Sequence, residues 1–227
     1  MTVSGEGILK VYIRENNGSN VFNAVNKCNI ALNNNTVTVI KGRSGSGKST
    51  LLNMLSGILI PSEGRILYDD RDIYSLSDKE LSGFRREHTG IIPQGKSAVA
   101  ALTVYENIVL PYTFFNEEID DYKAKWIEEL IKRLDISGIR DAMPSELSGG
   151  ELRRMAIARA LAKEPDVVYA DEPTGNLDDD NTGVVMDLLK EYALNGHTVL
   201  IVTHDSEAFS YADVVYRMNA GELEIVK

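Results

Sequence analysis

A glycine-rich segment near the N-terminus has the residue types and the spacing that bind phosphate. Residues 42–49 read Gly-Arg-Ser-Gly-Ser-Gly-Lys-Ser, which matches the pattern G-x-x-x-x-G-K-S/T in full. The glycines let backbone N–H groups turn inward around an oxyanion, and a helix start adds positive potential. Lys48 supplies a charge for the β- and γ-phosphates of a nucleotide, and Ser49 supplies a hydroxyl for Mg²⁺. The residues expected to bind the nucleotide are Gly42, Arg43, Ser44, Gly45, Ser46, Gly47, Lys48, Ser49 and Thr50.

The segments on either side of this loop fit its use as a nucleotide-binding loop. Residues 36–40 form a continuous apolar run rich in β-branched residues, as expected of a strand covered on both faces. Residues 49–58 read as a helix that contains Leu51, Leu52 and Leu55. The alternative is a flexible glycine-rich turn that happens to contain a lysine. Such a turn would need neither a buried strand before it nor a helix after it. We therefore predict a strand, a phosphate-binding loop and a helix in this order.

A second apolar run ends in two acidic residues. Residues 167–170 predict a buried strand, and Asp171 and Glu172 follow it directly. Asp171 is suited to holding Mg²⁺ through water, and Glu172 is suited to orienting and deprotonating an attacking water molecule. Acidic residues commonly end strands at a protein surface, so the pair alone is a weak signal. In a chain with a phosphate-binding loop the pair predicts nucleotide hydrolysis.

Residues 147–151 resemble the signature motif of the ATP-binding cassette (ABC) ATPases. They read Leu-Ser-Gly-Gly-Glu and precede a predicted helix at residues 152–161. In isolation, a serine and two glycines at a helix start favour a plain cap or turn, although they could also cradle a phosphate. The resemblance favours the cradle and implies that it faces the nucleotide of a partner chain. The residues so implied are Ser148, Gly149, Gly150 and Glu151.

Three further residues match this family in the expected order along essentially the whole chain. Gln94 resembles the Q-loop glutamine, which links Mg²⁺ and water to the transporter partner. Asp178 lies in a segment that resembles the D-loop, and His204 resembles the switch histidine that contacts the γ-phosphate. The resemblance implies ATP and Mg²⁺ as cofactors. It implies a catalytic role for Glu172, His204 and Gln94, and a metal-binding role for Ser49, Gln94 and Asp171.

Two segments are similar to one group within the family. Residues 171–178 and 105–111 look like those of the lipoprotein-releasing and macrolide-export type, a group that includes antimicrobial-peptide exporters and the cell-division ATPase. This similarity implies a membrane-spanning permease, a homodimer or heterodimer of ATPase subunits, and a cytoplasmic position at the inner face of the membrane. The alternatives are mechanotransmission without transport and a soluble ABC-type ATPase. A chromosome-maintenance ATPase needs a long coiled-coil insertion, which this sequence lacks.

The sequence departs from the family pattern near the expected adenine site and in two loops. Where the family often has a tyrosine, this chain has Glu15, Asn16 or Asn17, so Phe22 and Tyr12 become the candidates for stacking on adenine. Residues 95–100 lack the aromatic and leucine residues often found after the Q-loop glutamine, which predicts a different contact with the membrane partner. Arg43 replaces a common proline, with little expected effect because backbone amides bind the phosphate there.

The elements that must position these residues predict an α/β fold. Residues 36–40, 167–170 and 198–203 are continuously apolar and predict a mostly parallel sheet. Weaker strand signals at residues 8–13, within 21–40 and at 65–68 predict an antiparallel β portion near the N-terminus, with a turn at 33–35.

Helices are predicted where apolar residues recur at helical spacing, over residues 122–134, 152–161 and 184–192. We predict one nucleotide-binding domain over residues 1–227. Its P-loop NTPase core spans 1–94 and 152–227, and a helical subdomain is inserted at about 95–151.

Composition limits the other classes of function. The 227 residues carry 24 Lys and Arg against 34 Asp and Glu, a formal charge of −10. That balance disfavours nucleic-acid binding, so the pairs at 85–86 and 153–154 are expected to be solvated or in salt bridges. The single cysteine, Cys28, excludes an internal disulfide and points to a reducing compartment. Neither a signal peptide nor a membrane-spanning apolar run is visible.

Overall fold

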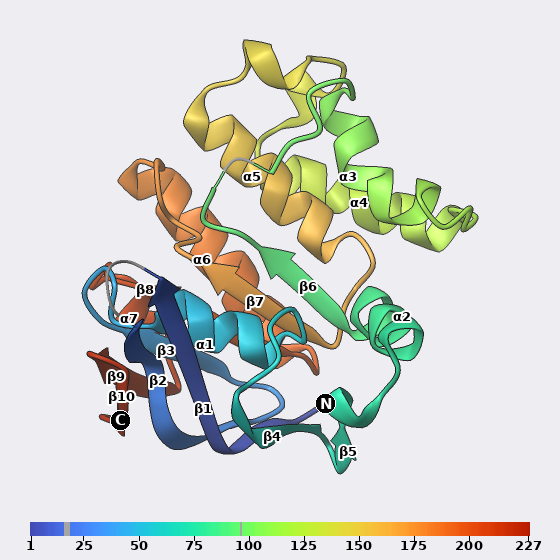
Figure 1. Ribbon diagram of the computed structural model, residues 1–227. Coiled ribbons are helices and arrows are strands. Elements are labelled where there is room, and N and C mark those ends of the chain that lie inside the picture. Colours follow the sequence, from blue (N-terminus) through green and yellow to red (C-terminus); the bar gives the residue numbers. More distant parts are fainter. Residues whose placement is uncertain (16–18, 96) are drawn as a thin grey trace.

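Two β-sheets and a group of helices make up the computed structural model, which describes residues 1–15, 19–95 and 97–227. Figure 1 shows the helices α3, α4 and α5 gathered above β6 and β7, with the N-terminal strands β1, β2 and β4 in the lower part of the view. Among the described residues, the structure contains no helix that is both long and apolar enough to span a membrane.

The larger sheet has six strands in the order β10-β9-β3-β8-β7-β6. The pairs from β9 through β3, β8 and β7 to β6 are parallel, and β10 is antiparallel to β9. Every residue of β7 and β8 is buried, which confirms the prediction that continuous apolar runs form strands covered on both faces. The strands are β3 (Val37–Lys41), β6 (Thr89–Ile92), β7 (Val167–Asp171), β8 (Thr198–Thr203), β9 (Val214–Asn219) and β10 (Glu222–Ile225).

The smaller sheet is antiparallel, as predicted for the N-terminal part of the chain, and its order is β2-β1-β4-β5. Its strands are β1 (Val3–Glu15), β2 (Ser19–Leu32), β4 (Glu63–Tyr68) and β5 (Arg71–Asp72). The strands β1 and β2 pair along nearly their whole length and reach toward the phosphate-binding loop.

Helix α1 (Lys48–Leu55) lies between the two sheets and buries Leu51, Leu52 and Leu55. It contacts both β1 and β8, so it joins the sheets into one core. The helix ends at Leu55 rather than at residue 58, because Gly57 adopts a φ of 77° that stops the helical path.

The segment after β6 is helical and contains no strand among its described residues 97–148. Helix α5 contacts α3 and α4 at one side and β6 at another, so it links this helical segment to the sheet. The helices of the chain after α1 are α2 (Asp78–His88), α3 (Val104–Thr113), α4 (Asp121–Arg133), α5 (Gly149–Leu161), α6 (Asp179–Leu194) and α7 (Ala208–Tyr211). Single 3-10 turns occur at Ile73–Ser75, Ser137–Ile139 and Pro144–Glu146.

Strand β7 supplies side chains to two hydrophobic cores. Val168 and Ala170 pack with the helices of the insert and α6, whereas Val167 and Tyr169 pack with α1 and the antiparallel sheet. The side chains of a strand alternate between the two faces of its sheet, so one five-residue strand is fixed from both sides. This double packing holds the end of β7 at a defined position.

Two buried tyrosines secure the end of α1. The hydroxyl groups of Tyr68 and Tyr169 lie 2.5 Å apart, and each is within hydrogen-bond reach of the Leu55 carbonyl oxygen, at 2.8 and 3.1 Å. Burial raises the pKa of both hydroxyls well above the usual range, so both stay protonated. The pair joins β4, β7 and the last turn of α1, where the carbonyl groups lack helical partners.

Replacing both tyrosines should destabilise the fold by more than the two single changes combined. Tyr68→Phe and Tyr169→Phe should each lower the free energy of unfolding by about 0.5–1.5 kcal/mol, because one donor to Leu55 remains. The double variant removes both donors and leaves the buried carbonyl without either. Urea titration checks this, with Tyr122→Phe as a control because its hydroxyl bonds to Glu164 at the surface. Additive effects would contradict the shared role.

Candidate functional site

A cavity of about 870 Å³ lies where β3, β6, β7 and β8 reach their carboxyl ends. Its lining residues come from segments near both ends of the chain and from both sheets. Parallel strands end at the same edge of a sheet, so the loops that follow them meet there. The lining residues are Tyr12, Phe22, Asn23, Ala24, Arg43, Ser44, Gly45, Gly47, Lys48, Ser49, Thr50, Gln94, Asp171, Glu172, His204, Ala220 and Gly221.

The phosphate-binding loop is tightly enclosed at two of its glycines. A Cβ atom on Gly47 would lie 2.1 Å from the Ala24 carbonyl oxygen, and one on Gly42 would lie 2.2 Å from that of Met218. Gly47 also has a φ of 107°, which L side chains rarely adopt. The loop is therefore wedged between β2 and β9, and its glycines are required by space as well as by backbone conformation.

Lys48 lies at the bottom of the cavity and holds the loop in shape. Its side chain is buried, and its ammonium group donates hydrogen bonds to the carbonyl oxygens of Gly42 at 2.7 Å and Arg43 at 3.0 Å. The same ammonium group lines the cavity beside the loop. The turn between β9 and β10 supports the loop from outside, because the Gly221 N–H donates to the Ser46 carbonyl oxygen at 3.0 Å.

Asp171 and Ser49 form a pair of oxygen donors beside the loop. Burial raises the pKa of the Asp171 carboxyl, while a hydrogen bond with the Ser49 side chain and the nearby Lys48 charge oppose that rise. Within the described residues, no three His, Cys, Asp or Glu side chains gather into a group that could hold a metal. One carboxylate and one hydroxyl suit Mg²⁺ when phosphate oxygens and water complete its coordination.

Glu172 is held at the cavity wall by both oxygens of its carboxylate. Its Oε2 accepts from the Thr203 hydroxyl at 2.8 Å, and its Oε1 lies 2.8 Å from Nδ1 of His204. The Glu172 N–H donates to the Val202 carbonyl oxygen at 2.8 Å, and the residue has a φ of 50°. Glu172 is buried whereas the His204 side chain is 76% exposed, so the carboxylate lines the cavity next to an exposed imidazole.

The prediction for Arg153 is wrong, because this residue is buried and makes no salt bridge to any side chain that the structure describes. Its guanidinium donates to the carbonyl oxygens of Asp171 at 2.5 Å and Pro173 at 3.1 Å, and also to those of Glu172 and Pro93. The spacing could have revealed it, because Arg153 shares the apolar face of α5 with Ala156 and Ile157. Arg154 instead bonds to the side chain of Asn181.

The residues of the signature segment lie outside this cavity. Ser148 and Glu151 form a capping box at the start of α5, in which the Ser148 N–H donates to Glu151 Oε2 at 2.7 Å. Ser148 and Gly149 are exposed, and Gly150 faces Asn176. Asp178 is also exposed and caps α6 by accepting from the Asn181 N–H at 2.9 Å. Within one chain these residues act as helix caps at a surface away from the phosphate-binding loop.

Tyr12 and Phe22 lie opposite each other on β1 and β2, at the rim of the cavity. Their rings stack with centroids 5.8 Å apart, and both are a little more than one-third exposed. Of the alternatives considered from the sequence, Asn16 and Asn17 lie outside the described residues, as does the side chain of Glu15. No sequence pattern pointed to Asn23, Ala24, Ala220 or Gly221, which reach the cavity only through tertiary folding.

A family model described as "ABC transporter" matches residues 25–175. The chain belongs to the ABC transporter family. The lipoprotein-releasing system ATP-binding protein LolD of Buchnera aphidicola is 38% identical over 88% of this chain and 87% of its own length. The macrolide export ATP-binding/permease protein MacB of a Shewanella species is 36% identical over 90% of this chain and 31% of that longer protein.

Among solved structures, a dimeric ABC cassette in a post-hydrolysis state, bound to ADP and Pi, matches with a TM-score of 0.89. It is 31% identical to this chain, and the match covers 99% of both chains. These findings confirm the predicted family and its α/β P-loop fold, with the N-terminal antiparallel sheet and the helical segment. The chain thus carries the ATPase cassette of the ABC transporter family.

Removing the Lys48 charge should weaken ATP binding by this cassette. Lys48→Ala should raise the dissociation constant by roughly 10- to 100-fold, as expected for losing a hydrogen bond to a charged group of about 1.5–3 kcal/mol. Titration calorimetry measures the affinity, and Lys27→Ala is the control because that lysine is exposed and paired with Glu63. An unchanged affinity in Lys48→Ala would show that ATP does not use this loop.

Proposed function

We propose that this chain hydrolyses ATP in the described cavity, with Glu172 as the general base, and thereby powers export through a separate membrane-spanning permease. The observation that carries the proposal is the placement of the buried Glu172 carboxylate beside the phosphate-binding loop and His204. A carboxylate held in this way can orient a water molecule and accept its proton.

The phosphates would be bound first by the loop, and the lining residues would then act on them. Lys48 would exchange its carbonyl partners for the β- and γ-phosphates, and the N–H groups at the start of α1 would face the same charge. Ser49, Asp171 and Gln94 would hold Mg²⁺, which when bound neutralises charge that develops on the phosphates. Tyr12 and Phe22 would offer the adenine an aromatic surface at the cavity rim.

Glu172 and His204 would have different roles in the attack by water: Glu172 would accept the proton and His204 would contact the γ-phosphate. The bond from Thr203 fixes Oε2 of Glu172, which leaves Oε1 as the atom able to accept a proton. His204 is exposed enough to turn toward a γ-phosphate, and it would then release Oε1 to the water. Two side chains that already share a hydrogen bond would thus exchange that bond for contacts with the reacting groups.

Replacing Glu172, the proposed general base, should separate ATP binding from turnover. Glu172→Gln should keep ATP affinity close to that of the parent but lower phosphate release by ~10²–10⁴-fold, the range for loss of a general base. Glu191→Gln is the control, because that carboxylate is exposed and pairs with Arg133 far along α6. Turnover near the parental rate in Glu172→Gln, at saturating ATP, would overturn the assignment.

The export role rests on the relatives and on the position of Gln94. The names of the relatives LolD and MacB refer to lipoprotein release and macrolide export, which favours a peptide, lipoprotein or drug-like substrate carried by another chain. Gln94 is exposed, follows β6 and lines the cavity, so a permease that contacts this face could be coupled to the nucleotide through Gln94. The chain would act in the cytoplasm at the inner face of the membrane, held there by the permease.

We further propose that each ATP is shared between two chains in a homodimer or heterodimer. The exposed start of α5, with Ser148 to Gly150, lies outside the cavity of its own chain and is free to cover the phosphates in a second one. A head-to-tail arrangement with two-fold symmetry lets both chains make the same contacts. The matching solved cassette is dimeric, which supports this arrangement.

Mixing two defective chains tests the shared site. Lys48→Ala damages the loop and Ser148→Arg blocks the exposed helix start, so neither variant should form a working site with itself. A mixture should build one intact site from Lys48 of one chain and Ser148 of the other. ATP-dependent crosslinking across the interface and phosphate release are the measurements. If the mixture shows neither while the parent shows both, the shared site is rejected.

A further inference from the structure

Helix α5 carries a buried arginine that contacts two separate loops of the site. Arg153 is 6% exposed, and its guanidinium donates to the backbone carbonyl oxygens of Pro93, Asp171, Glu172 and Pro173. None of its hydrogen bonds goes to a carboxylate, so this cation serves backbone groups only. A buried charge is costly unless such contacts compensate it, which indicates a specific use for the arginine.

The contacted carbonyl groups belong to the chain positions that matter for hydrolysis. Pro93 directly precedes Gln94 at the end of β6, and Asp171 and Glu172 end and follow β7. The strands β6 and β7 pair only from Thr89 to Ile92, so beyond Ile92 no ladder hydrogen bond holds the two segments together. The guanidinium of Arg153 bridges them just where the pairing ends.

An arginine suits this position better than any other side chain. Its planar guanidinium has five N–H donors in a fixed fork, so it can bond several carbonyl groups that approach from different directions. A lysine has the same charge but only one donor atom. The positive charge also opposes the rise that burial causes in the pKa of Asp171.

We propose that Arg153 is a positioning residue for hydrolysis, which holds the backbones of Gln94 and Glu172 in a fixed relation and ties both to α5. The proposal rests on the proposed role of Glu172. Arg153 lies little more than one helical turn from Ser148, so one side chain links the exposed start of α5 to the backbone of Glu172 in the same chain. A change in the tilt of α5 would thus move the carbonyl groups that set the direction of Glu172.

The expected signature is a loss of turnover without a loss of nucleotide binding. Arg153→Gln should lower kcat by about 10²-fold, the effect of misplacing a reacting group by roughly 1 Å, and should leave ATP affinity within about twofold. Arg153→Lys should recover little of the lost turnover, because it restores the charge but not the fork. Phosphate release at saturating ATP, titration calorimetry and thermal melting are measured on each full-length variant.

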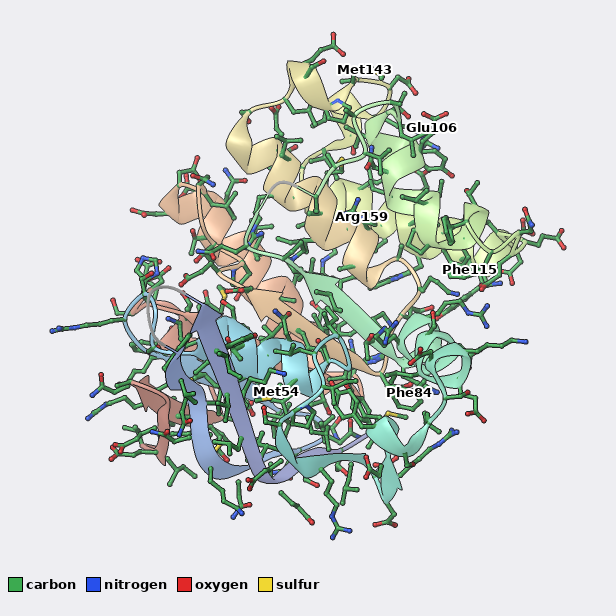
Figure 2. The ribbon with its side chains drawn as sticks, viewed as in Figure 1. Met54, Phe84, Glu106, Phe115, Met143 and Arg159 are labelled. Carbon is green, nitrogen blue, oxygen red and sulfur yellow. The ribbon has the colours of Figure 1, made fainter. Side chains whose placement is uncertain are left out.

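Arg159→Gln is the matched control. Arg159 lies on the same helix, as Figure 2 shows, and its partly buried guanidinium donates to the carbonyl oxygen and the hydroxyl of Ser97 at 2.8 and 2.6 Å. It does not line the cavity and makes no hydrogen bond to Gln94 or Glu172. Its replacement should reduce the melting temperature but keep kcat within about threefold of the parent. The reason is that Arg159 does not hold the backbone of Gln94 or Glu172, so its loss should not misplace the reacting groups.

The outcomes separate this proposal from the proposed function. A parent protein that binds ATP without turnover would remove the basis for both. A parent with turnover, and Arg153→Gln with parental kcat, would overturn only the positioning role. The role is also overturned if Arg159→Gln loses as much turnover as Arg153→Gln, or if Arg153→Lys restores it fully. If both Arg153 variants fail to fold or to bind ATP, the arginine serves stability and the positioning role is rejected.

Discussion

The structure depends on keeping two neighbouring carboxylates, Asp171 and Glu172, buried at the end of β7. Burial raises the pKa of Asp171, and both carboxylates are held by neighbouring polar groups. The Ser49 hydroxyl and the Lys48 charge face Asp171, and the Thr203 hydroxyl bonds Glu172. Lys48 and Ser49 begin α1, which follows β3 and its loop, and Thr203 is the last residue of β8; β3 and β8 are the two central strands of the sheet. The order of the parallel strands is what brings them together.

The second sheet and α1 complete the site from the other side. α1 begins at the phosphate-binding loop and is fixed at its far end by Tyr68 and Tyr169, so its first turn cannot shift without disturbing both sheets. The antiparallel sheet places Ala24 against Gly47 and carries Tyr12 and Phe22 to the cavity rim. The loop proposed to bind phosphate and the aromatic rim proposed for adenine are therefore held by the same packed core.

Sequence patterns predicted the central strands and most of the cavity because those features are local. The strands β3, β7 and β8 are continuous apolar runs, and residues 42–49 follow a strict spacing. The strand β6 was missed because it has only four residues and contains Gly90, which lets it pass close to Ala160 of α5. Arg153 was misjudged because an arginine pair in an acidic chain predicts a surface. Its carbonyl partners are distant in sequence, and only the folded backbone shows them.

The most direct test of this account is an experimental structure of Glu172→Gln crystallised with ATP and Mg²⁺. We predict one ATP in the cavity of each chain, with its γ-phosphate between Lys48 and the substituted side chain at position 172. Ser148 of a second copy should contact the same phosphate, and the adenine should lie against Tyr12 or Phe22. A nucleotide bound with its γ-phosphate away from position 172, or touched by no second chain, would contradict it.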